Sequence, residues 1–153
     1  MANAECESYT MDNIILPNDV VFDSVQQLLD EGKDVVIIVK GWSMLPSMRH
    51  MRDSVRLHRV EKELREGDVV LAKIGSKYVM HRLIGIKGDY LVLKGDGVLV
   101  NTESCKKKDI LGVVTCIIRK NGKEVQPNEE RLWRKLPVLI RKVVLVVLSR
   151  IYR

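Results

Sequence analysis

Several signatures of other protein classes are missing from this chain of 153 residues. Its three cysteines, Cys6, Cys105 and Cys116, are an odd number without C-x-x-C spacing, so neither a disulfide framework nor a zinc site is predicted. The three histidines lack the H-E-x-x-H arrangement of a metal site, so we expect no metal. Reducing, cytoplasmic conditions fit this cysteine content best.

Long apolar runs are also missing. The first thirty residues show no positively charged start followed by an apolar segment, so no secretory signal is expected. The longest apolar runs of the tail, 136–140 and 143–148, are separated by Arg141 and Lys142. Both are far shorter than the ~20 residues that a helix needs to span a bilayer.

Carboxylates are absent from residues 131–153, which carry seven basic residues: Arg131, Arg134, Lys135, Arg141, Lys142, Arg150 and Arg153. Since the whole chain has a formal charge of +6, removing these seven charges leaves residues 1–130 at −1. The basicity belongs to the tail, so we do not expect a nucleic-acid-binding surface spread over the domain.

The hydrophobic content of 46% is enough for one buried core. We expect an extended arm over 1–17, a single β domain with an N-terminal helix over 18–126, and a basic amphipathic tail over 127–153. The helix should begin at Asn18 or Asp19 and end before Gly32. Strands are predicted at 35–39, 54–59, 69–74, 77–86, 90–93, 113–119 and 123–125, with hairpin turns at 75–76 and 121–122.

A serine lies at a predicted turn directly after the first predicted strand. Ser43 lies in the run Lys-Gly-Trp-Ser-Met-Leu-Pro, and the strand before it would expose its hydroxyl at the turn. A lone hydroxyl is a poor nucleophile at neutral pH and needs a base within hydrogen-bond reach. His81, on the returning strand of a predicted hairpin, is the natural candidate. His58 precedes the Gly67 turn and is expected to be a half-exposed strand histidine, and His50 receives no role.

Four short motifs resemble, in order and spacing, those of the signal peptidase I and LexA-like serine peptidase superfamily. They are the nucleophile box Ser43-Met44-Leu45-Pro46, the turn Gly67-Asp68-Val69-Val70, the base box His81-Arg82 and the box Lys94-Gly95-Asp96. The resemblance covers about residues 35 to 118 and implies a mainly β fold, a small and partly closed barrel. Histidine followed by arginine is similar to the endoplasmic-reticulum and archaeal-like branch, whereas the bacterial and LexA-like branches usually have lysine.

The resemblance also implies site roles. Ser43 would be the nucleophile and His81 the general base, with no cofactor. The family's third carboxylate aligns with Thr102, so either Glu103, one position later, or Asp96 is expected to orient His81. Signal peptidases often have an oxyanion-stabilising serine at the position of Gly41, so backbone amides near Ser43 should carry that role. The expected substrate groove comprises Val39, Lys40, Gly41, Trp42 and Met44.

We therefore expect a serine endopeptidase that binds an extended peptide and processes a leader peptide or a partner protein. One alternative is a catalytically inactive peptide-binding module of the same fold. A self-cleaving LexA-like regulator is disfavoured, because the residues before the first strand leave no room for a helix-turn-helix domain and its linker. Residues 131–153 either lie on an anionic membrane surface, at its cytoplasmic face, or pack against the domain or a second copy. No oligomeric state is predicted.

Overall fold

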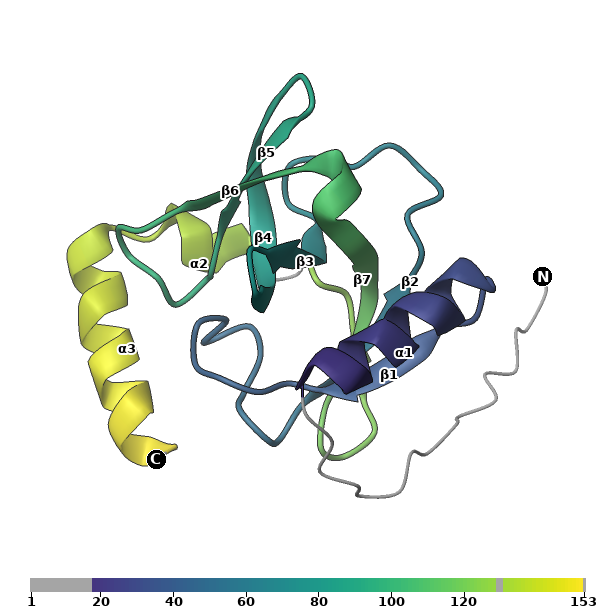
Figure 1. Cartoon of the computed structure of the whole chain (residues 1–153). Helices are drawn as coiled ribbons and strands as arrows, with labels where there is room; N and C mark the ends of the chain where they lie inside the picture. The colour runs from purple at the N-terminus through teal and green to yellow at the C-terminus, as the bar shows by residue number, and fades with distance from the viewer. Residues whose placement is uncertain (1–17, 129–130, 153) are drawn as a thin grey trace, which may run out of the picture.

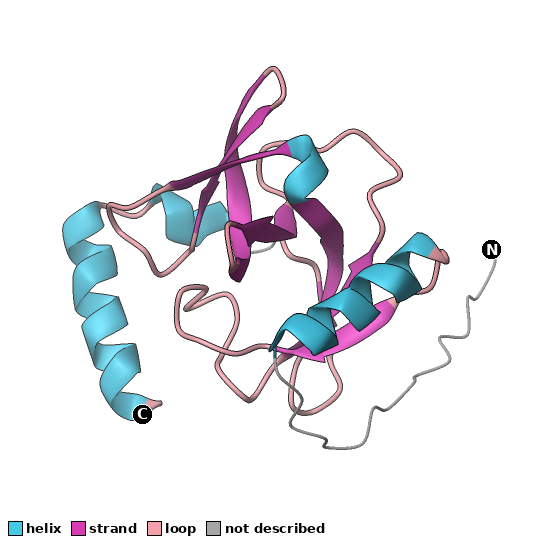
Figure 2. Cartoon of the chain, viewed as in Figure 1, coloured by secondary structure: helices cyan, strands magenta, loops and turns pink. Residues whose placement is uncertain are grey.

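The computed structural model describes residues 18–128 and 131–152, so the predicted arm at 1–17 lies outside the described residues (Figure 1). Strands dominate the domain, as Figure 2 shows. In chain order the elements are α1 (Asn18–Asp30), β1 (Val35–Ile38), β2 (Ser54–His58), β3 (Val69–Ile74), β4 (Lys77–Lys87), β5 (Tyr90–Lys94), β6 (Glu103–Lys106), the short 3₁₀ helix η1 (Lys107–Asp109), β7 (Ile110–Ile118), β8 (Glu124–Val125), α2 (Arg131–Lys135) and α3 (Val138–Ile151).

The strands form one antiparallel sheet in the order β1-β2-β7-β3-β4-β5-β6, with β8 paired to β7. The mainly β fold class is thus confirmed. In the described residues β1 and β6 end the sheet without pairing to each other, so the sheet is not closed into a barrel. Strand β6 was not predicted, because its sequence Glu-Ser-Cys-Lys is mostly polar.

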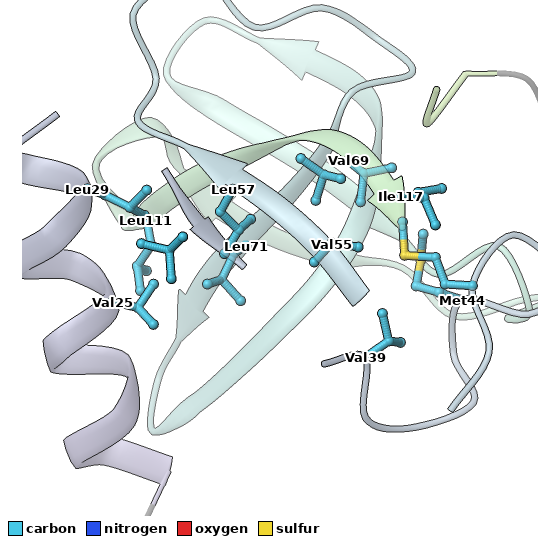
Figure 3. Packing of buried hydrophobic residues seen from close by; sticks show 13 residues of the cluster. Val25, Leu29, Val39, Met44, Val55, Leu57, Val69, Leu71, Leu111 and Ile117 are labelled. Carbon is cyan, nitrogen blue, oxygen red and sulfur yellow. The ribbon is translucent and has the colours of Figure 1, made fainter. Parts of the chain in front are cut away.

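Two apolar clusters lie on opposite faces of β3, whose first four residues are all buried. Val69 and Leu71 belong to the cluster that α1 covers, and Figure 3 shows Val25 and Leu29 of α1 close to Leu111 and Leu71 of the sheet. Val70 and Ala72 point the other way, into a cluster with apolar residues of β4 and β5. The alternation follows from the two-residue side-chain period of a strand. It makes β3 the central strand of the domain.

The predicted local signals at both ends of the domain are confirmed. Helix α1 ends at Asp30, shortly before Gly32, whose φ of +79° suits glycine, and the amide of Lys33 donates to the carbonyl of Leu28 at 3.0 Å. At the Asn121-Gly122 turn, the amide of Gly122 donates to the carbonyl of Arg119 at 2.8 Å. This turn joins β7 to β8.

The tail forms two helices that separate at Pro137, as expected for a residue that cannot continue a helix. Among the described residues, no helix has both the length and the apolar character required to cross a bilayer.

Candidate active site

Ser43 lies in the loop after β1, and buried apolar residues anchor this loop to the core. Gly41 turns the chain with a φ of +96°, and the loop closes where the amide of Met51 donates to the carbonyl of Val39 at 2.8 Å. Met44 and Met48 are buried in the α1-covered core, whereas Ser43, directly before Met44, remains half-buried. The core packing therefore fixes the loop and leaves the serine accessible.

The Lys94-Gly95-Asp96 turn packs against the backbone of this loop. The amide of Gly97 donates to the carbonyl of Ser43 at 2.8 Å. A Cβ on Gly95 would lie 2.4 Å from that same carbonyl oxygen, and a Cβ on Gly97 would lie 3.0 Å from two further carbonyls of the loop. Glycine is required on both sides of Asp96, because only hydrogen atoms fit between the two backbones.

Asp96 is committed to a buried ion pair. Its two carboxylate oxygens accept hydrogen bonds from Nε and Nη2 of Arg82 at 2.8 and 2.6 Å, and one also accepts the hydroxyl of Ser47. Arg82, only 1% exposed, also donates to the carbonyls of Gly67 and Pro127 at 2.8 and 2.9 Å. Through these contacts Arg82 joins three of the sequence motifs: the base box, the Gly67 turn and the Lys94-Gly95-Asp96 box.

His81 has a different carboxylate beside it. It lies on β4, is buried, and places Nδ1 2.8 Å from Oε2 of Glu103 at the start of β6. The distance is that of an ion pair, but the two groups are not aligned as a hydrogen bond, and neither atom has a hydrogen-bond partner among the described residues. Of the two candidate carboxylates, Glu103 is therefore the one next to His81.

Ser43 and His81 line the same small pocket of about 120 Å³. The other lining residues are Val39, Lys40, Gly41, Met44, Tyr78, Val79 and Met80. Four of the five expected groove residues are present, but Trp42 is not among them. The three contributed by β4 were missed, although they directly precede His81 in the sequence. A larger hollow of about 410 Å³ beside η1 contains none of the predicted site residues.

Trp42 turns toward His50 instead of the pocket. The two ring centroids are 5.0 Å apart, and Nδ1 of His50 accepts a hydrogen bond from the amide of Gly41 at 2.8 Å. His50, which received no role from the sequence, thus stabilises the turn before Ser43. Its position on the same loop as Ser43 is the feature of the sequence that could have indicated this role.

His58 lies on β2, as predicted, and is not a lining residue of the pocket. Its Nδ1 is 2.5 Å from Oδ1 of Asp34, and its Nε2 is 3.3 Å from Oε2 of Glu61. The hydrogen bond to Asp34 is the main cause that raises the pKa of His58 above its usual value, while partial burial opposes it.

The antiparallel sheet and the serine loop packed against a glycine-rich turn define a peptidase-like β domain. The family model described as Peptidase S24-like matches residues 2–115. The chain belongs to this family, and the match covers Ser43, His81 and Glu103 but ends before α2 and α3. No curated protein matches the sequence.

Proposed function

We propose that this protein is a serine endopeptidase of the histidine-base type. The observation that carries the proposal is that Ser43 and His81 line one pocket, with the Glu103 carboxylate 2.8 Å behind the imidazole. In this reaction Ser43 attacks a peptide carbonyl while His81 takes the hydroxyl proton as general base. His81 then returns the proton to the leaving amine as general acid.

Glu103 orients His81 in this scheme. A carboxylate beside Nδ1 favours the tautomer with its proton on that nitrogen, which leaves Nε2 free to accept the proton of Ser43. The same carboxylate stabilises the imidazolium that forms in the reaction. Asp96 instead stabilises the turn that supports the serine loop, because both of its oxygens are bound by Arg82 and Ser47.

Backbone amides near Ser43 stabilise the oxyanion. The amide of Gly41 already donates to His50, so it is not free for this task. The amides of Ser43 and Met44 have no acceptor among the described residues. Two donors at the nucleophile itself are a suitable arrangement for the negative charge that develops on the carbonyl oxygen.

The substrate binds as an extended strand between two free backbone edges. β1 pairs only with β2 in the described sheet, and residues 77–81 of β4 pair with β3 but not with β5, whose pairing begins at Arg82. Both segments lead into the pocket. Main-chain hydrogen bonds would supply affinity, and the small apolar pocket would select a side chain. The substrate class is a leader peptide or an exposed segment of a partner protein.

An inactive peptide-binding module is the second candidate, and the imperfect alignment of Glu103 with His81 favours it. A fluorophosphonate probe that labels activated serines separates the two. We expect labelling of the folded protein that Ser43→Ala and His81→Ala abolish, and that Glu103→Gln slows by roughly 10²–10⁴-fold. Labelling should also fall toward acid pH, because a protonated imidazole cannot accept the serine proton.

His58→Gln is the matched control, since His58 is outside the pocket, and it should label like the natural chain. Circular dichroism would show that each variant is folded. Absence of labelling in the folded natural chain, or labelling that persists in Ser43→Ala, would reject the peptidase in favour of the binding module.

A further inference from the structure

Helix α3 exposes an apolar face to solvent. None of its described residues is buried, and seven apolar residues are between 46% and 73% exposed: Val138, Leu139, Ile140, Val143, Val146, Val147 and Ile151. Most of them fall on one side of the helix at steps of three and four residues. The exposed apolar set is large for a single helix, so this face is suited to contact with an apolar phase.

Helix α3 contacts the peptidase domain through Arg141, and Tyr152, directly after the helix, makes a second contact. Arg141 donates to the carbonyl of Asp96 at 3.1 Å and lies 5.4 Å from the ring centroid of Trp133, while Arg49 lies 4.4 Å from that of Tyr152. Trp133 is buried and donates to the same Asp96 carbonyl at 2.9 Å. In Figure 1 α3 stands at the side of the domain away from α1. These contacts present the apolar face outward.

The basic residues of 131–153 indicate which kind of partner can cover the apolar face of α3. Lys142 and Arg150 are exposed on α3, and no carboxylate occurs anywhere in residues 131–153. A second copy docking through the same helix would bring like charges together without a compensating anion. An anionic headgroup layer complements them, at about 1 kcal/mol per basic residue near the surface. A helix of 14 residues extends only about 21 Å, so it would lie along the surface and not across the bilayer.

We propose that α3 docks the protein on the surface of an anionic lipid bilayer. The apolar face enters the headgroup boundary, and the basic side chains pair with lipid phosphates. The contacts of Arg141 and Trp133 with Asp96 then hold the Ser43 loop in a fixed orientation above the membrane. This inference goes beyond the proposed peptidase activity and does not depend on it.

The test is sedimentation of the full chain with vesicles of phosphatidylcholine alone or mixed with phosphatidylglycerol. We expect at least roughly 10-fold tighter binding to the anionic vesicles, weakened by salt. The double variant Val143→Asp with Val147→Asp should lose this binding, and Lys142→Gln with Arg150→Gln should lose roughly 5-fold per charge. Val20→Asp, which places one such substitution on the exposed side of α1, should bind like the natural chain.

Equal binding to both vesicle types would overturn the proposal, as would binding that survives Val143→Asp with Val147→Asp. Sedimentation equilibrium without lipid tests the alternative that a second copy of the chain covers the apolar face of α3. A dimer that this double variant dissociates would assign the face to a second copy and reject the bilayer. Because circular dichroism monitors folding and fluorophosphonate labelling monitors the active site, failure of docking is distinguishable from failure of the peptidase.

Discussion

At the scale of single residues, the two carboxylates near the active site differ in what neutralises them. Asp96 is buried with two hydrogen bonds from a guanidinium, an arrangement that compensates the cost of removing both charges from water. Glu103 is partly exposed and has the imidazole of His81 as its neighbour. In the proposed reaction, the carboxylate beside the imidazole is the one suited to assist proton transfer.

His58 makes the stability of the fold depend on pH. Its raised pKa means that folding favours the protonated ring, through the hydrogen bond to Asp34. The stabilisation is complete below the unfolded-state pKa and is lost as the pH rises through the higher folded-state pKa. We expect His58→Gln to destabilise the protein more at about pH 5 than at about pH 8, by a small amount because the pair is partly exposed.

Urea denaturation of His58→Gln and of the natural chain at both pH values checks this prediction. A stability difference for His58→Gln that is equal at the two pH values would contradict the assignment.

At the scale of elements, the Lys94-Gly95-Asp96 turn acts as a backbone support for the serine loop. We expect Gly95→Ala to reduce the rate of labelling at Ser43 by roughly 10²-fold, because its Cβ would press on the Ser43 carbonyl and displace the nucleophile. The overpacking should also cost about 1–3 kcal/mol of unfolding free energy.

Gly85→Ala is the matched control, since the nearest atom to its Cβ would be Cβ of Val92 at an ordinary 3.7 Å. Labelling kinetics and urea denaturation of both variants are the measurements. A Gly95→Ala variant with unchanged labelling would show that the loop does not depend on this contact.

Most strands of the sheet could be predicted from the sequence, but β6 could not. Apolar and β-branched residues, together with the turns between them, identified seven of the strands, because local preference and burial agree in segments such as 69–74. β6 was missed, since its pairing with β5 and not its composition makes it a strand. For the same reason the sequence left Glu103 and Asp96 as alternatives, and only the placement of β6 brings Glu103 to His81.

At the scale of the whole molecule, Arg82 connects three distant parts of the chain. Its guanidinium binds the Gly67 turn, Asp96 and the carbonyl of Pro127, where the tail begins. From the tail, the indole N–H of Trp133 donates a hydrogen bond to the carbonyl of Asp96. The predicted boundary at residue 126 therefore lies inside a network of contacts between the peptidase domain and the tail.

We expect Asp96→Asn to destabilise the whole domain by about 3–5 kcal/mol, because it leaves the charge of Arg82 buried without its partner. Urea denaturation measures the loss as a single cooperative transition. Asp89→Asn, at an exposed turn, should change stability by less than about 0.5 kcal/mol. A small effect of Asp96→Asn would mean that other groups neutralise Arg82.

For the proposed peptidase, the unpaired edges of β1 and of residues 77–81 of β4 would restrict when a substrate can be cleaved. A polypeptide can pair with these edges only while its own amides and carbonyls are unpaired. Any cut site that has entered a helix or a sheet of its own is protected, whatever its residues. Cleavage by such an enzyme would thus be confined to the interval before its target folds, or to a tail that never folds.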